Sequence, residues 1–276
     1  MKAIKAVLDF YISSSIHVAL AVCSLSWITL LKFNLPYDEN LLYFVFFASI
    51  IGYNFVKYFG VVNFHYRSLT TWLIGVYELS FICLLLMGHY LFQLNVDTII
   101  AVAVCCVITF FYAVPMLPKH FFLDDSQKLR SISGLKIYII ALVWVGVTVY
   151  LPLLNAEFYF DENVQLIAIQ RFVFILALML PFEIRDLKYD SLKLATIPQK
   201  IGVRRTKNIG LILLLVFTVL ELFQPLSTSG SILRVILVAV ISAVLILYSK
   251  IQQSKYYSGL LVEAVPIVWL LLILVF

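Results

Sequence analysis

Long apolar runs separated by short polar connections dominate the chain. About nine of these runs are long enough to cross a bilayer as a helix, which takes roughly 20 residues. They lie near residues 10–31, 41–62, 71–93, 97–116, 134–155, 164–182, 208–224, 231–249 and 257–276. The pattern predicts an all-α polytopic membrane protein with about nine transmembrane helices. No composition shift or long linker divides it, so we expect a single domain over residues 1–276.

The composition supports this interpretation. The chain is 63% hydrophobic and only 13% charged, whereas about 25% of the residues of a soluble protein are charged. All four cysteines lie in apolar runs, which favours small apolar side chains over a disulfide framework or a zinc site. Membrane lipid is the expected environment, and we expect no nucleic-acid partner.

The positive charges are distributed unevenly between the two sides of the predicted bundle. If the N-terminus is inside, 16 of the 20 Lys and Arg residues lie in the inner connections, and only Lys32 and Arg234 lie in the outer ones. Lys136 and Arg171 fall within spans, and we expect Arg171 to snorkel or to pair near the outer surface. This asymmetry predicts a cytoplasmic N-terminus and an outward C-terminus. With no organelle-targeting segment evident, we expect an integral protein of a bacterial inner membrane.

The longest polar passage, residues 181–205, reads PFEIRDLKYDSLKLATIPQKIGVRR. Glu183, Asp186 and Asp190 are spaced i, i+3 and i+7, which on a helix places three carboxylates on one face. Their mutual repulsion is relieved if a positive charge lies between them. Oxygen-only ligands favour Mg²⁺, which commonly shares its ligand shell with substrate phosphates. The alternative interpretation is a solvated loop of mixed charge.

Basic residues accompany these acids and suit a polyanionic ligand. They are Arg185, Lys188, Lys193, Lys200, Arg204, Arg205 and Lys207. A second donor-rich group, on the same predicted side, comprises Asn54, Lys57, His65 and Arg67. Arg130 and Lys136 bracket the start of the fifth helix there. For Lys57, snorkelling to the membrane surface is an equally good explanation.

Three further polar features lie within spans. The run Ser13 to Ser15 is typical of helix packing rather than substrate binding. Glu78 is a candidate for a functional group, but pairing with Lys57 or Arg67 explains it equally well. Glu263 is isolated, and the sequence assigns it no role.

The stretch FEIRDLKYDSLKLATIPQKIGVRRTK resembles the second aspartate-rich motif of the UbiA superfamily of intramembrane prenyltransferases. That motif reads D-x-R-D-x-x-x-D, followed by a basic segment and a [LI]-G-x-x-[RK] helix start. The matching residues are Glu183 (Glu for Asp), Arg185, Asp186, Asp190, Lys193, Ile201, Gly202, Arg204 and Arg205. YAVPMLP and LRSISGLKIYIIALVWVGV are similar to that family's Tyr-x-x-Pro segment and its Gly-Leu-Lys start of helix five.

The first aspartate-rich motif of the family, N-D-x-x-D-x-x-x-D, is degenerate in this chain. Asn54 is retained, but Phe55, Tyr58 and Val62 stand where aspartates are expected. No acid lies between Glu39 and Glu78. This side of the site therefore cannot bind a metal ion through carboxylates, and Lys57 could contact a diphosphate directly.

The resemblance implies a UbiA-like bundle that transfers an isoprenoid chain from a prenyl diphosphate to an aromatic or lipid acceptor at the cytoplasmic face. It implies Mg²⁺ held mainly by Glu183, Asp186 and Asp190, with Asp186, Asp190 and Lys57 as the catalytic residues. The implied substrate-binding residues are Asn54, Arg67, Arg130, Lys136, Arg185, Lys193, Arg204 and Arg205.

The alternative is a catalytically inactive relative that binds a prenyl lipid or serves as a subunit of a membrane complex. Loss of the first-motif acids favours the inactive relative. Retention of Asp186, Asp190 and the basic segment favours the enzyme.

Overall fold

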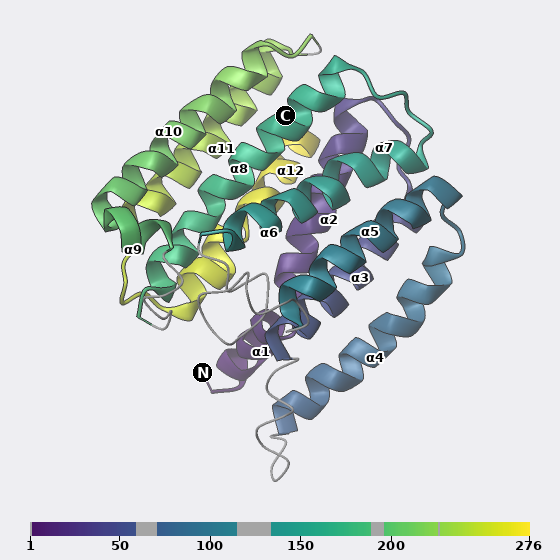
Figure 1. Ribbon diagram of the computed structural model, residues 1–276, viewed down its shortest axis with the longest axis horizontal. Coiled ribbons are helices and arrows are strands. Elements are labelled where there is room, and N and C mark those ends of the chain that lie inside the picture. Colours follow the sequence, from purple (N-terminus) through teal and green to yellow (C-terminus); the bar gives the residue numbers. More distant parts are fainter. Residues whose placement is uncertain (1, 59–70, 115–133, 189–195, 226) are drawn as a thin grey trace, which may run out of the picture.

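The computed structural model describes residues 2–58, 71–114, 134–188, 196–225 and 227–276. Within these residues all regular secondary structure is helical (Figure 1). The helices are α1 Lys2–Ser13, α2 Ile16–Lys32, α3 Glu39–Tyr58, α4 Thr71–Leu91, α5 Val96–Ala113, α6 Lys136–Val145, α7 Leu151–Asn155, α8 Glu162–Asp186, α9 Ile197–Ile201, α10 Val203–Leu222, α11 Ser229–Tyr248 and α12 Val265–Val275. Two π-helical segments, η3 Gly146–Tyr150 and η5 Tyr257–Val262, continue α6 and precede α12.

The predicted all-α membrane architecture is confirmed, with a difference in the number of spans. Among the described residues, seven helical stretches are long and apolar enough to cross a membrane, and the bent α1–α2 pair can provide an eighth. The predicted run near 208–224, seventh in chain order, forms α10, a helix of 20 residues that is not among these stretches. Because Arg204, Arg205 and Lys207 lie in its first turns and Glu221 near its end, α10 is less uniformly apolar than the others.

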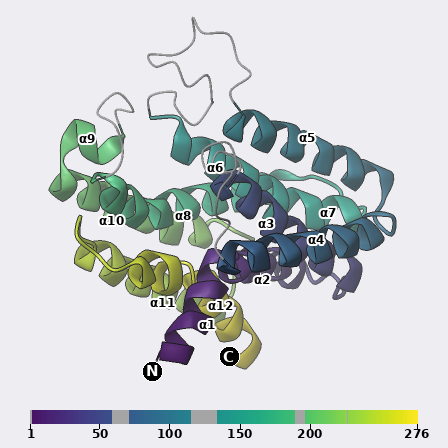
Figure 2. The same cartoon turned by 90° about the horizontal axis from the view of Figure 1, so that it is seen from below.

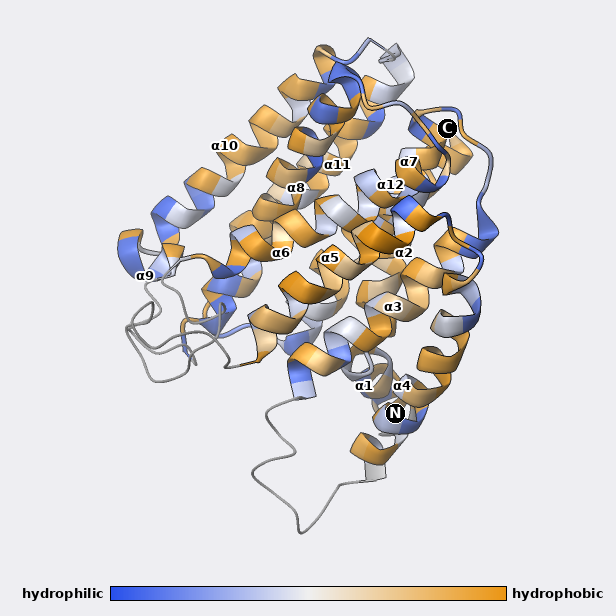
Figure 3. Cartoon of the chain, turned by 45° about the vertical axis from the view of Figure 1, so that its right-hand side comes forward, coloured by the Kyte–Doolittle hydropathy of each residue, from blue (hydrophilic) through white to orange (hydrophobic). Residues whose placement is uncertain are grey.

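The helices lie side by side, with α10 and α11 at one edge of the bundle and α4 at the other (Figure 1). Viewed from below, α1, α11 and α12 occupy one side and α5, α6 and α9 the other (Figure 2). Hydrophobic residues fill the middle of the helices, and hydrophilic ones gather towards their ends (Figure 3). In the most apolar 18-residue stretch of α8, 67% of the residues are buried, against 17% in the corresponding stretches of α4 and α5. Hence α8 is the central helix, and α4 and α5 present most of their surface outward.

Aromatic packing joins α8 to α10 and α12. The rings of Phe174 and Phe217 stack with centroids 4.7 Å apart, and Trp269 meets both edge-on. Arg171, one turn before Phe174 on α8, lies over the Trp269 ring at 5.5 Å and is 2% exposed. Its guanidinium donates to the Leu25 carbonyl (2.9 Å) and to Thr29 Oγ1 (3.4 Å). The expectation that Arg171 snorkels or pairs is therefore wrong among the described residues, because α2 supplies neutral acceptors for it.

The π-helix η3 also depends on α2 for its hydrogen bonds. Ser26 Oγ donates to the Val147 carbonyl (3.4 Å) and Thr29 Oγ1 to the Thr148 carbonyl (2.6 Å). An irregular helix leaves backbone groups that must find partners within the protein, because a membrane interior has no water to offer. By donating to carbonyls of η3, these two side chains allow a π-helical segment to lie between α6 and α7 inside the bundle.

The start of α8 is fixed by a capping side chain. Asp161 accepts a hydrogen bond from the Val164 backbone N–H (3.0 Å), the arrangement that favours Asp before a first helical turn. This bond holds the pKa of the Asp161 carboxyl below its ordinary value. The cap thereby fixes one end of the helix whose other end carries the second acidic motif.

Close approach between α10 and its neighbours generates a stability prediction. A Cβ at Gly210 would lie 3.0–3.1 Å from Ile246 on α11 and Leu180 on α8, whereas one at Gly88 on α4 meets nothing within 4 Å. Both substitutions to Ala improve helix propensity, but only Gly210→Ala overpacks a contact, which costs roughly 1–3 kcal/mol. We expect Gly210→Ala to lower the thermal unfolding midpoint of the purified protein and Gly88→Ala to leave it equal or higher. If Gly210→Ala unfolds at the same temperature as the wild type, Ile246 and Leu180 can move aside at little cost.

Candidate active site at the end of α8

Helix α8 continues through Pro181 to Asp186, four residues beyond the predicted end of that span. The carbonyl of Pro181 accepts a hydrogen bond from Gln253 Nε2 at 3.0 Å. Glu183 and Asp186 therefore stand one turn apart on the last turns of the helix, as their i, i+3 spacing predicts. Glu183 is buried, at 2% exposure. Asp190 lies outside the described residues.

A lysine ammonium lies between these two carboxylates. Lys136 Nζ is 3.1 Å from Glu183 Oε1 and 3.4 Å from Asp186 Oδ2. Lys136 is the first residue of α6, where a positive charge is unfavourable because it opposes the helix dipole. The attraction of the two carboxylates therefore accounts for its position better than α6 does. The sequence predicted that something positive separates the acids, and the structure assigns that position to Lys136.

Arg185 adds a second cation from α8 itself. Its Nε and Nη2 both lie 2.8 Å from Asp186 Oδ1, and its Nη1 donates to Ser258 Oγ on η5 at 2.8 Å. The guanidinium also lies over the Phe182 ring at 5.3 Å. We call Lys136, Glu183, Arg185 and Asp186 the motif cluster. It joins α6, α8 and η5 at one end of the bundle.

The first predicted span breaks where the three serines lie. Between α1 and α2 the axis bends by 56°, and Ser15 adopts a left-handed conformation with φ 65°. The end of α3 covers this break. Tyr58 OH donates to the Ser13 carbonyl (2.8 Å), and Lys57 Nζ donates to Ser15 Oγ (2.8 Å) and to the Ile12 carbonyl (3.4 Å). Lys57 thus acts in part as a cap on a broken helix.

Asn54 connects the same break to α4. Its Oδ1 accepts from Ser15 Oγ (2.8 Å), its Nδ2 donates to Ser80 Oγ (2.9 Å), and it is 5% exposed. We call Ser15, Asn54, Lys57 and Ser80 the helix-break cluster. Interpreting the serine run as helix packing alone was therefore incomplete, because Ser15 also bonds two side chains of the degenerate first motif.

Glu263, which has no role assigned from the sequence, is near enough to both clusters to feel their charges. The positive charges of Lys57 and Arg185 both act on its carboxylate, and on each other. It follows η5 directly, and the Leu260 carbonyl of that π-helix hydrogen-bonds His17 Nε2 at 2.9 Å. Single-turn π-helices are frequent at functional sites. The signal that could have found Glu263 is the lone acid in an apolar span.

The remaining predicted residues are distributed as follows. Gly202, with φ 82°, separates α9 from α10, which explains the glycine of the predicted helix start. Arg204 and Arg205 are exposed on the first turn of α10, and no contact of either with the motif cluster is described. Glu78 is exposed on α4, without an ion pair among the described residues. The predicted site residues Arg67, Arg130, Asp190 and Lys193 lie outside the described residues.

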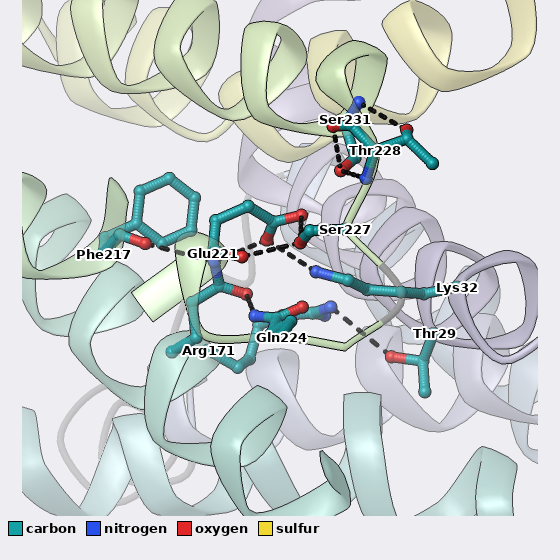
Figure 4. Close-up of polar contacts among 10 residues, drawn as sticks. Thr29, Lys32, Arg171, Phe217, Glu221, Gln224, Ser227, Thr228 and Ser231 are labelled. Atoms are coloured by element: carbon teal, nitrogen blue, oxygen red, sulfur yellow. Dashed lines mark hydrogen bonds and ion pairs between the residues drawn. The ribbon is translucent and has the colours of Figure 1, made fainter. Parts of the chain in front are cut away.

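A second buried polar network occupies the opposite end of the bundle (Figure 4). Lys32 Nζ lies 2.7 Å from Glu221 Oε2, and Gln170 Nε2 donates to the same oxygen at 2.8 Å. Ser227 Oγ is 3.1 Å from Glu221 Oε1, and Gln224 donates to Gln170. Both oxygens of Glu221 thus have donors within the protein. This pairing is typical of a structural tie between α2, α8 and α10.

The described carboxylates do not fit Mg²⁺ as they are arranged. Glu183 and Asp186 share the ammonium of Lys136, and Asp186 also holds Arg185. A divalent ion at these oxygens would meet two cations at close range. Within the described residues, no group of three or more acidic, His or Cys side chains could hold a metal ion. The three-carboxylate site predicted from the sequence depends on Asp190, which lies outside them.

Comparison with solved structures relates this arrangement to a known fold. Over 94% of this chain and 98% of the other, the structure matches the apo structure of a UbiA homolog from Aeropyrum pernix K1, with a TM-score of 0.68 and 14% sequence identity. The chain has the UbiA fold. It also matches the structure of a digeranylgeranylglyceryl phosphate synthase, over 100% of this chain and 98% of that one, with a TM-score of 0.58 and 14% identity. No protein-family model and no curated protein sequence matches.

The UbiA fold confirms the architecture that the sequence resemblance implied, and it makes the chain an integral membrane protein. Within it, two separately recognised segments meet. Lys136 belongs to the Gly-Leu-Lys helix start, and Glu183 and Asp186 belong to the second acidic motif, about fifty residues later. Their contact places the residues of both segments in one cluster.

The contacts of Lys57 predict a structural effect that is separate from any substrate. Lys57→Met removes two hydrogen bonds to the helix break and should cost roughly 1–2 kcal/mol of unfolding free energy. Lys255→Met is the matched control, since Lys255 is 57% exposed and pairs with Asp9 at the surface. We expect the first substitution to lower the thermal midpoint in detergent and the second to leave it nearly unchanged. An equal effect of both would show that the break does not depend on Lys57.

Proposed function

We propose that the protein is an intramembrane prenyltransferase that moves an isoprenoid chain from a prenyl diphosphate to an aromatic or lipid acceptor. The observation that carries this proposal is the contact of Lys136 with Glu183 and Asp186 within a UbiA fold. The second supporting fact is the similarity in fold to a digeranylgeranylglyceryl phosphate synthase. A purely structural bundle does not explain why the two motif-like segments meet at one buried cluster.

In this proposal the diphosphate binds to the cations of the site. Lys136 and Arg185 belong to the motif cluster, and Lys57, on α3, is near enough to Arg185 for their two positive charges to repel each other. A diphosphate would compete with Glu183 and Asp186 for these donors. Arg suits the planar, paired contacts that phosphate oxygens offer, and Lys supplies a point charge.

The chemical step requires stabilisation of the departing anion. The C–O bond of the allylic diphosphate breaks and its electron pair leaves with the diphosphate. The allylic cation is then attacked by the acceptor, which loses a proton. Cations fixed before the reaction stabilise the developing charge on the leaving group. The apolar walls exclude water from the allylic cation. Aromatic faces can stabilise it. Trp144 on α6 donates a hydrogen bond from its indole Nε1 to the Tyr53 hydroxyl on α3 (2.6 Å).

Several sequence-based expectations belong to this proposal and remain predictions. Asp190 as a catalytic residue, and Arg67, Arg130 and Lys193 as diphosphate donors, lie outside the described residues. The resemblance predicts Mg²⁺ at Glu183, Asp186 and Asp190, but the two described carboxylates are paired with Lys136 and Arg185 instead. The location of the site at the cytoplasmic face of a bacterial inner membrane rests on the distribution of Lys and Arg.

The test is diphosphate release by the purified protein in lipid, supplied with a panel of prenyl diphosphates and a lipid extract, with and without Mg²⁺. We expect the wild type to release diphosphate and Asp186→Asn to reduce the rate at least tenfold. The reason is that Asp186 positions both Lys136 and Arg185. Labelled product would then identify the acceptor.

Asp161→Asn is the matched control, because Asp161 caps the opposite end of the same helix and Asn caps equally well. It should release diphosphate at the wild-type rate. Saturable prenyl diphosphate binding without release would instead indicate a binding protein. A fully active Asp186→Asn protein would exclude the motif cluster as the site.

A further inference from the structure

The ammonium of Lys136 occupies the place between two carboxylates that the sequence reserves for a metal ion. Nζ lies 3.1 Å from a Glu183 oxygen and 3.4 Å from an Asp186 oxygen, and the three side chains are only 12%, 3% and 19% exposed. This is a buried ion-pair network rather than a surface contact. Removing one member of such a network leaves a buried charge without a partner, and this makes the folded state much less stable.

Among the residues that the structure describes, the formal charges of the motif cluster balance without a metal. Two carboxylates, Glu183 and Asp186, face two cations, Lys136 and Arg185. Mg²⁺ requires close, near-octahedral oxygen coordination. To bind these oxygens it would have to displace the ammonium and remain beside the guanidinium. Displacing the ammonium and placing Mg²⁺ beside the guanidinium are both unfavourable, because charges interact strongly in a low-dielectric environment.

We propose that Lys136 is the resident cation of this site and excludes divalent metal from Glu183 and Asp186. If the proposed function also holds, the prenyl diphosphate binds to Lys136 and Arg185 directly, with no metal ion bridging it to these acids. The degenerate first motif is consistent with this arrangement, since α3 contributes Lys57 in place of metal-binding carboxylates.

The sharpest consequence is that loss of the lysine creates a metal site. In Lys136→Met, Glu183 and Asp186 stand one turn apart without the ammonium, and a divalent cation becomes the available counter-charge. Mn²⁺ is a suitable probe, because it shares the oxygen preference of Mg²⁺ and is visible by electron paramagnetic resonance. Titrations use protein in phosphatidylcholine nanodiscs without substrate, with empty nanodiscs subtracted.

We expect Lys136→Met to bind Mn²⁺ at least tenfold more tightly than the wild type, and Lys136→Met/Glu183→Gln to lose that gain. Lys136→Arg keeps the charge and should show no gain. Lys32→Met is the matched control at the other end of the bundle. It frees one buried carboxylate, Glu221, whose described partners besides Lys32 are amide and hydroxyl groups. It should gain no Mn²⁺ binding.

Lys136→Gln is prepared in parallel, because its amide can still donate to the acids if Lys136→Met fails to fold. Tight Mn²⁺ binding by the wild type that Glu183→Gln abolishes would overturn the proposal. So would a folded Lys136→Met or Lys136→Gln protein without a gain.

A second arm measures binding of geranylgeranyl diphosphate to the wild type in EDTA and in Mg²⁺. We expect the two affinities to agree within about twofold, and a tenfold loss in EDTA would overturn the metal-free mode of binding. No binding in either condition would instead count against the proposed function. The Mn²⁺ titrations would still decide the role of Lys136, so the two failures are distinguishable.

Discussion

A polar group inside an apolar bundle must find its partner within the protein, because lipid offers none. This constraint accounts for most of the irregular features of the structure. The carbonyls of η3 accept from Ser26 and Thr29 on α2. The end of α11 is covered by Lys207 from α10, whose Nζ lies 2.7 Å from the Leu247 carbonyl. Arg171 binds the backbone of α2 rather than reaching for the surface.

The same constraint gives the degenerate first motif a physical role. A bend of 56° between α1 and α2 exposes carbonyls that a straight helix would pair internally. Tyr58 and Lys57 satisfy them, and Asn54 bonds the left-handed Ser15 at the corner. Aspartates could not donate to these carbonyls, because an ionised carboxylate only accepts hydrogen bonds. Tyr58, which stands where the resemblance leads one to expect a metal ligand, is one of the donors that the broken helix requires, and Lys57 beside it is the other.

The fold was predictable from the sequence because membrane helices are marked by local features, the length of apolar runs and the spacing of polar residues. Apolar length marked the spans, and the i, i+3 spacing correctly placed Glu183 and Asp186 on one helical face. Long-range partners left no such signal. Nothing in the local pattern indicated that Lys136 would reach α8, since it stands at a helix N-terminus where a lysine is unfavourable. Glu263 was visible as a lone intramembrane acid, but its relation to Lys57 and Arg185 depends on how α3, α8 and η5 pack. The break at Ser15 was missed because serines within an apolar run also suit a straight, closely packed helix.

A lysine and a metal ion solve the problem of adjacent carboxylates in different ways. A divalent ion brings two charges and arrives from solution, so its occupancy follows its concentration. Lys136 brings one charge and is tethered to α6, so its occupancy is set by folding. Arg185 supplies a second positive charge beside it, in contact with Asp186. A tethered cation can be drawn from the acids by a competing anion and still remain within reach of them. In the proposed reaction, a diphosphate would therefore take its counter-charge from the protein's own ion pairs, and departure of the product would let those pairs re-form.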